Sequence, residues 1–180
     1  MNRGRIEVIT GPMFSGKTSE VLRRLMRYSL AGKSYVYLKP KCDTRNQKTS
    51  ISTVRGELNI TPIYSDSFLD ISEVYNSDVI VVDEAQFVKH GLKGFCRSHR
   101  DDGQIVLICG LDMDSHMEPF GQMGDIMAIA DSVTKLTAIC KCGAEAPFTK
   151  KISGNPGQRI EIGDKELYAP RCLNCYLEEE

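Results

Sequence analysis

The sequence predicts an α/β fold in which a parallel sheet is covered by helices on both faces, followed by a small cysteine-rich module. Short runs made almost entirely of apolar residues alternate with segments of helical periodicity, and such runs are typical of strands buried on both faces of a parallel sheet. After about residue 138 this alternation stops, and paired cysteines, glycines and short strand-like segments replace it. We therefore expect two domains, at residues 1–138 and 139–180.

The first elements follow from local sequence signals. IEVI at 6–9 is expected to form a buried strand that ends in a glycine-bounded loop. A helix is expected to begin at Thr18, because apolar residues then recur at helical spacing, and to end at Gly32. A second strand is expected at 35–38, and the polar residues 41–47 are expected to form a loop.

The elements further along the chain continue the same rhythm. DVIVV and IVLIC are rich in β-branched residues and predict buried strands, and the segments around them predict helices. The expected order is a short helix at 67–76, a strand at 78–82, a helix at 92–100, a strand at 105–109 and a helix at 123–130.

Composition and charge exclude two classes of protein. No segment of the 180 residues approaches the run of about 20 apolar residues that a membrane helix needs, so we expect no membrane partner and a cytoplasmic location. The formal net charge of −1 lacks the excess of Lys and Arg on which general nucleic-acid binding depends, so no nucleic-acid partner is expected. The basic pair Lys150 and Lys151 is expected to lie on a solvated face.

A phosphate-binding loop is predicted between the first strand and the first helix. GPMFSGKT has the pattern glycine, four residues, then Gly-Lys-Ser/Thr, in the strand–loop–helix context that such a loop requires. Its backbone N–H groups and the helix dipole favour an anion, Lys17 is expected to contact the β- and γ-phosphates, and Thr18 to bind Mg²⁺. The alternative is a chance match with Lys17 on the surface. The predicted nucleotide-binding residues here are Gly11, Pro12, Met13, Phe14, Ser15, Gly16, Lys17 and Thr18.

Two adjacent carboxylates end the predicted strand at 78–82. In P-loop folds an aspartate at this point faces the phosphate loop and holds Mg²⁺, which suits Asp83. The next residue, Glu84, points in a different direction and is free to act as a general base on an incoming hydroxyl. The alternative is that Glu84 is a solvated loop acid.

Four of the seven cysteines form two close pairs, Cys140-x-Cys142 and Cys172-x-x-Cys175. In a reducing compartment four thiolates at this spacing predict a closed, tetrahedral and structural zinc site in a ribbon-like domain. The alternative is that they are free thiols or small buried hydrophobes, which is the interpretation we prefer for Cys109 in its apolar run.

Several motifs in order resemble the thymidine kinases of the human cytosolic type. These are GPMFSGKT, DEAQF, GLDMD, PFG and the cysteine segment with IEIGDKELY, and together they cover essentially the whole chain. The resemblance implies a P-loop kinase that transfers the γ-phosphate of ATP to the 5′-hydroxyl of thymidine, giving dTMP in nucleotide salvage, and that also phosphorylates deoxyuridine. It also implies a homotetramer.

The resemblance further assigns roles to residues. Glu84 resembles the catalytic base of the family, and Phe120 resembles the aromatic that stacks on the base; core packing is the alternative for Phe120 and Tyr168. By match to the family, further nucleotide-binding residues are Asp43, Thr44, Arg45, Asp83, Glu84, Ala85 and Gln86. By the same match, the thymidine-binding residues are Met13, Phe120, Thr149, Arg159, Ile160, Glu161, Ile162, Gly163 and Tyr168.

The chain departs from the family pattern at two places. The first cysteine pair is one residue shorter than the usual C-x-x-C, and Ser115-His116 stands where the family usually has phenylalanine. His116 is expected to lie on the surface rather than to act as a base. Two other functions compete with a kinase: a P-loop ATPase whose zinc ribbon binds nucleic acid, and a nucleotide-binding regulator without catalysis.

Overall fold

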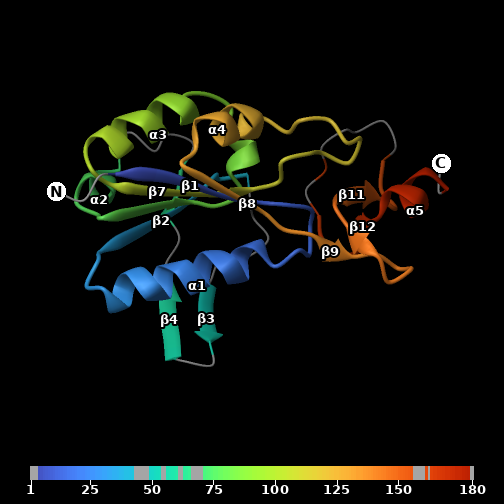
Figure 1. Cartoon of the computed structure of the whole chain (residues 1–180), viewed down its shortest axis with the longest axis horizontal. Helices are drawn as coiled ribbons and strands as arrows, with labels where there is room; N and C mark the ends of the chain where they lie inside the picture. Colours follow the sequence, from blue (N-terminus) through green and yellow to red (C-terminus); the bar gives the residue numbers. More distant parts are fainter. Residues whose placement is uncertain are drawn as a thin grey trace.

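The computed structural model of the chain describes residues 4–42, 49–53, 56–60, 63–65, 71–155, 161 and 163–178. Its centre is a six-stranded sheet with the order β5-β2-β6-β7-β1-β8 (Figure 1). All the strand pairings in this sheet are parallel, which confirms the predicted α/β class. The strands are β1 Arg5–Thr10, β2 Tyr35–Lys39, β5 Ile63–Tyr64, β6 Val79–Val82, β7 Ile105–Gly110 and β8 Ser132–Lys135.

Helix α1, Lys17–Leu30, covers one face of the sheet (Figure 1). Its apolar residues recur every three or four positions, so that one stripe of the helix faces the strands. Leu25 lies in this stripe and packs in a buried cluster with Ile9 and Leu107. The apolar strand residues that point toward the opposite face lie under other helices, as expected for a sheet buried on both sides.

Helices α3, Leu92–Asp101, and α4, Met123–Ile129, cover that opposite face (Figure 1). Phe95 and Ile126 pack there with Ile108 and with the other strand residues of the second cluster. The expected helix at 67–76 is shorter than predicted: α2 is Ser72–Tyr75, and residues 66–70 lie outside the described part of the chain.

Some elements carried no clear signal in the sequence. β8 is an edge strand whose side chains are mostly exposed, so it has no apolar run by which to be recognised. A hairpin of β3, Thr49–Thr53, and β4, Gly56–Ile60, pairs antiparallel outside the central sheet, and a short 3₁₀ helix covers Ala85–Phe87. Among the described residues, no helix is both long enough and apolar enough to cross a membrane.

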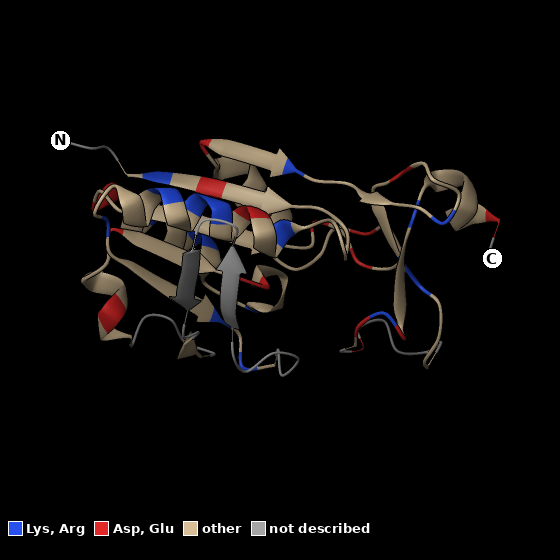
Figure 2. Cartoon of the chain, turned by 90° about the horizontal axis from the view of Figure 1, so that it is seen from below, with Lys and Arg blue, Asp and Glu red and all other residues tan. Residues whose placement is uncertain are grey.

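The cysteine module lies at one end of the molecule (Figures 1 and 2). Two small antiparallel sheets and helix α5 build it, in line with the predicted ribbon-like domain. The boundary that we propose after residue 138 falls within β9, just beyond the last strand of the large sheet. The elements are β9 Ala138–Ile139, β10 Glu145–Ala146, β11 Phe148–Lys151, β12 Tyr168–Arg171 and α5 Leu173–Leu177.

The prediction of a solvated face at Lys150 and Lys151 was wrong. Both residues are only partly exposed, and both ammonium groups have partners within the module. Lys150 donates to the carbonyl oxygen of Tyr176, and Lys151 forms an ion pair with Glu161 at 2.7 Å. The long alkyl stems of lysine pack along the module while the charged ends reach acceptors, which the two-residue basic pattern did not indicate.

Candidate active site

Three loops meet at the carboxyl edge of the sheet because their strands are neighbours. The order β6-β7-β1 places the residues after these strands side by side. The phosphate loop at residues 11–18 follows β1, Asp83 and Glu84 follow β6, and the segment beginning with Leu111 follows β7. The topology thus brings together motifs that are separated by up to a hundred residues in the sequence.

The phosphate loop has the backbone that its glycines allow. Gly11 has φ 140°, and a Cβ at this position would lie 2.3 Å from the carbonyl oxygen of Leu136, so glycine is required. The Lys17 ammonium group donates to the carbonyl oxygens of Gly11 at 3.1 Å and Pro12 at 2.7 Å. Burial lowers the pKa of Lys17, while nearby acidic groups oppose that shift. The lysine is therefore held inside the loop, close to where a phosphate group would bind.

Asp83 is buried, and several neighbouring donors surround its carboxylate. Its Oδ2 accepts a hydrogen bond from the Tyr37 hydroxyl at 2.7 Å and lies 3.4 Å from the Lys39 ammonium group. Its Oδ1 accepts the backbone N–H of Glu84 at 3.0 Å. With only 3% of its surface exposed, the carboxylate needs these donors as hydrogen-bond partners in place of water.

Glu84 adopts a backbone conformation that is uncommon for its residue type. Its φ of 53° lies in the left-handed region, where strain is often retained at functional sites. The Gln86 amide donates to Glu84 Oε2 at 2.6 Å and accepts the backbone N–H of Leu111 at 3.0 Å. Gly110 permits this contact, because a Cβ there would lie 2.6 Å from Gln86 Oε1. Gln86 thereby orients Glu84 and links the loops after β6 and β7.

A cavity of about 220 Å³ joins these loops to the cysteine module. The module is attached to the phosphate loop by the backbone N–H of Met13, which donates to Thr149 Oγ1 at 2.9 Å. The Tyr168 hydroxyl donates to the carbonyl oxygen of Glu161 at 2.7 Å and so fixes the segment that carries Glu161 against β12. Hydrogen bonds therefore hold the cavity wall at Met13 and Thr149 and the wall at Glu161 and Tyr168.

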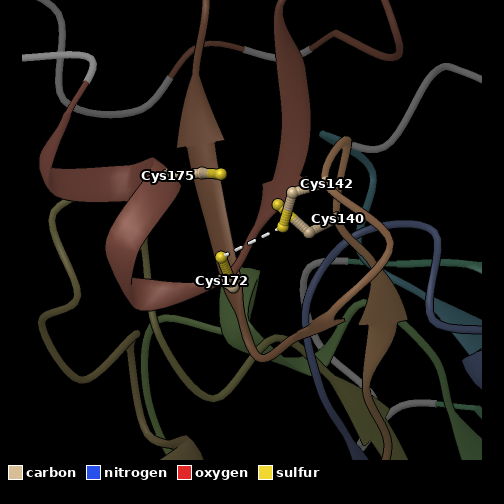
Figure 3. A group of neighbouring side chains, drawn as sticks. All are labelled: Cys140, Cys142, Cys172 and Cys175. Carbon is tan, nitrogen blue, oxygen red and sulfur yellow. Dashed lines mark hydrogen bonds between the residues drawn. The ribbon is translucent and has the colours of Figure 1, made fainter.

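The four paired cysteines converge although they come from distant parts of the sequence (Figure 3). Their sulfur atoms all lie within 4.8 Å of one another, and the Sγ atoms of Cys142 and Cys172 are 3.6 Å apart. Tetrahedral zinc with Zn–S bonds of about 2.3 Å would hold its sulfurs about 3.8 Å apart, so the spacing fits. The group could hold a structural zinc ion, and the shorter first pair does not prevent it.

The cysteine sulfurs differ in their surroundings. Backbone N–H groups of Cys142 and Cys172 lower the pKa of the Cys140 thiol to about 6, so this sulfur is readily deprotonated. Burial raises the pKa of Cys175 to about 12. A bound cation would deprotonate such a thiol by direct coordination.

Comparison with known proteins identifies the family. The family model described as thymidine kinase matches residues 4–176. The chain belongs to the thymidine kinase family. A thymidine kinase of Bacteroides thetaiotaomicron is 44% identical over 97% of this chain and 88% of its own length. Thymidine kinases of Porphyromonas gingivalis strain W83 (41% identical, 98% of this chain and 86% of the relative) and Roseiflexus sp. (39%, 96% and 95%) are also similar.

Solved structures with similar folds support the architecture alone. The flagellar accessory protein FlaH from Methanocaldococcus jannaschii superposes with a TM-score of 0.53 at 13% identity, covering 86% of this chain and 75% of its own. The genome packaging NTPase B204 from Sulfolobus turreted icosahedral virus 2 gives 0.51 at 13% identity, covering 79% of each chain. Both likenesses agree with a P-loop NTPase-type sheet.

Most of the predicted nucleotide-binding and thymidine-binding residues line the central cavity of this thymidine kinase family member. Gly11, Pro12 and Ala85 do not line it; Ala85 lies in the hydrophobic core. Asp43, Thr44, Arg45, Arg159, Ile160 and Ile162 lie outside the described residues. The predicted residues that line the cavity are Met13, Phe14, Ser15, Gly16, Lys17, Thr18, Asp83, Glu84, Gln86, Phe120, Thr149, Glu161, Gly163 and Tyr168.

Sequence reasoning missed part of the cavity wall. The motif GLDMD served above only as a mark of the family. It begins with the last residue of β7, which lies between β6 and β1 in the sheet. Its position at the carboxyl end of a central strand is the signal that predicts a place in the site. Phe87 also contacts Phe120 edge-on, with ring centroids 5.6 Å apart. The additional lining residues are Phe87, Leu111, Met113, Asp114, Ser115 and Asp164. His116, expected on the surface, is exposed.

Proposed function

We propose that this member of the thymidine kinase family transfers the γ-phosphate of ATP to the 5′-hydroxyl of thymidine to give dTMP for nucleotide salvage, and that it also phosphorylates deoxyuridine. One observation carries the proposal: the phosphate loop, Glu84 and the module residues Thr149 and Tyr168 line a single cavity. A triphosphate at one end and a nucleoside at the other would meet beside the Glu84 carboxylate. The family membership supports the same reaction.

The phosphate loop supplies the binding of the triphosphate. Its backbone N–H groups and the start of α1 favour an anion, and Lys17 neutralises charge on the β- and γ-phosphates as the bond between them breaks. Mg²⁺ would be held by Thr18 and Asp83, and it supplies charge neutralisation between the two phosphates. Both residues line the cavity, and hydrogen bonding to the Tyr37 hydroxyl holds the Asp83 carboxylate in its position. Asp43, Thr44 and Arg45 are proposed to lie near the triphosphate.

Glu84 is proposed to be the general base. It accepts the proton of the nucleoside 5′-hydroxyl while that oxygen bonds to the γ-phosphorus, and the bond from the γ-phosphorus to the ADP oxygen breaks. The hydrogen bond from Gln86 to Oε2 holds the carboxylate in one orientation within the cavity. ADP leaves with the electrons of the broken bond, and the proton of the nucleoside hydroxyl stays on Glu84.

The nucleoside is proposed to bind between Phe120 and the module. Backbone groups of Arg159, Ile160, Glu161, Ile162 and Gly163 would hydrogen-bond the thymine edge, with Tyr168 supporting them through its bond to Glu161. Met13 and Thr149 would contact the 5-methyl group. Zinc in the four-cysteine group would hold this module together without touching the substrate, because no ligand position remains open. We also propose a homotetramer and a cytoplasmic location.

A transfer assay with γ-labelled ATP and a panel of nucleosides tests this function. Thymidine should be phosphorylated most efficiently, and deoxyuridine about fourfold less so, because one buried methyl group contributes about 0.8 kcal/mol. Deoxycytidine should react at least 10²-fold less, because its base reverses the donor and acceptor on the thymine edge and leaves buried groups unpaired. Efficient transfer to deoxycytidine, or DNA-stimulated ATP hydrolysis without transfer, would contradict the proposal.

A further inference from the structure

Tyr176 connects the last helix of the cysteine module to the turn that follows β7. It comes directly after Cys175 in α5, and its side chain is buried. Its hydroxyl donates a hydrogen bond to the carbonyl oxygen of Ser115 at 2.5 Å. Because Ser115 lines the central cavity, this bond joins the helix that carries a candidate zinc ligand to the cavity wall.

The Tyr176 ring is held in place by neighbours within the module. Phe148 contacts it edge-on, with ring centroids 6.0 Å apart. The Lys150 ammonium group lies 4.7 Å from the ring centroid and also donates to the Tyr176 carbonyl oxygen. The position of the hydroxyl therefore depends on β11 and α5 staying folded together, and α5 contributes Cys175 to the four-cysteine group.

The turn at the other end of the bond is closed by its own hydrogen bonds. Asp114 Oδ1 accepts the backbone N–H groups of His116 at 2.9 Å and Glu118 at 3.1 Å, and Met113 pairs with Pro119 in an isolated bridge. These bonds shape the turn but do not connect it to the module. The buried Oγ of Ser115 has no hydrogen-bond partner among the described residues, so the bond to the Ser115 carbonyl matters for holding this residue.

We propose that Tyr176 is a positioning residue for the nucleoside, coupling the metal-stabilised module to the Ser115 wall of the cavity. The proposal rests on the proposed function in taking this cavity as the nucleoside site. When the cysteine group is intact, α5 keeps the hydroxyl against the Ser115 carbonyl and the wall has one position. When the group loses its metal or a ligand, the bond is released and the wall moves, while the phosphate loop stays anchored between β1 and α1.

The test is Tyr176→Phe, which removes the hydroxyl and keeps the ring contacts. Hydrogen exchange of the backbone amides at 114–118 should become faster, while zinc content stays at one ion per chain. The thymidine KM should rise about 3- to 10-fold, the change expected for loss of one buried hydrogen bond, with the ATP KM and kcat unchanged. Tyr28→Phe is the matched control, since its hydroxyl donates to Glu7 in the sheet; it should change neither the exchange at 114–118 nor the thymidine KM.

Ser115→Ala tests whether the carbonyl or the side chain of Ser115 matters. It keeps the backbone carbonyl that accepts the bond from Tyr176, so hydrogen exchange at 114–118 should stay slow. Removing zinc from the unmodified protein should accelerate that exchange, and removing it from Tyr176→Phe should add little, since both changes break the same bond. Unchanged exchange in Tyr176→Phe, or faster exchange with an unchanged thymidine KM, would overturn the proposal. A protein with the expected exchange changes but no nucleoside kinase activity would instead refute the proposed function.

Discussion

The large domain that carries the phosphate loop and the cysteine module are stabilised by different forces. The large sheet buries strand residues completely on both faces, with Ile80 and Leu107 at 0% exposure. The module has a smaller core, in which one buried cluster consists of Ala138, Ala146 and the candidate metal ligands Cys140 and Cys175. The first region can fold by burial of apolar surface, whereas we expect a metal ion in the four-cysteine group to stabilise the second.

The two regions also have different proposed roles, phosphate transfer in the large domain and nucleoside binding mainly in the module. The groups that act on phosphate lie on loops anchored by the parallel sheet, where backbone geometry is fixed by neighbouring strands. Apart from Met13 and Phe120, the groups proposed for the nucleoside lie on the module, which is joined to the large domain by the Met13–Thr149 and Tyr176–Ser115 hydrogen bonds. Changes in one region should therefore alter turnover, and changes in the other should alter nucleoside affinity.

The largest effect on activity is expected from Glu84→Gln in the first region. Loss of the general base should lower kcat on the order of 10²–10⁴-fold, while the ATP KM, zinc content and thermal unfolding temperature stay close to their original values. Steady-state kinetics with thymidine and a thermal unfolding scan measure these quantities. Glu73→Gln, at an exposed position of α2, is the control and should be fully active. A kcat for Glu84→Gln near that of the unmodified protein would remove Glu84 from the mechanism.

A smaller and different effect is expected from Cys172→Ser in the module. Loss of one metal ligand should raise the thymidine KM on the order of 10–100-fold and lower the thermal unfolding temperature, with a near-normal ATP KM. Zinc analysis by mass spectrometry should show less than one ion per chain. In Cys96→Ala a buried thiol of α3 is lost instead, and zinc content should not change. A zinc-free Cys172→Ser protein with normal thymidine KM would show that the module does not depend on metal.

The smallest effect on activity is expected from Glu7→Gln, a change within the sheet half that acts on stability. Burial alone would raise the pKa of Glu7, but hydrogen bonds from Tyr28, Arg5 and Arg24 outweigh it and lower the pKa. A lowered pKa in the folded state means that the carboxylate stabilises the fold above its unfolded pKa of about 4.3 and loses this contribution as the pH falls.

At pH 7 the Glu7→Gln protein should be less stable by about 1–3 kcal/mol, the range for hydrogen bonds to a charged group. The difference should shrink as the pH falls below the unfolded pKa of Glu7 and through its lower folded pKa, because Glu7 itself then becomes protonated. Urea unfolding at several pH values measures it, and thymidine kinetics at pH 7 should change little. A stability difference that does not depend on pH would contradict the role assigned to the Glu7 carboxylate.

Several features of this protein could be predicted from the sequence because their signals are contiguous. GPMFSGKT carries its own turn glycines, lysine and hydroxyl, and the runs DVIVV and IVLIC have no stable position except inside a sheet. The two cysteine pairs likewise predicted one group, which the structure brings together within 4.8 Å. Edge strand β8 escaped prediction because its exposed residues make no apolar pattern.

The local parts of the site follow from the sequence: the phosphate loop, the acid pair at the end of a strand, and the cysteine pairs. Contacts between distant residues depend on the tertiary structure, in which Gln86 orients Glu84 and the Tyr176 hydroxyl reaches the Ser115 carbonyl from α5. Each of these contacts joins loops or elements whose relative positions depend on strand order and on the packing of the module. Short-range patterns carry no information about distances across the sheet, so these contacts had no signal in the sequence.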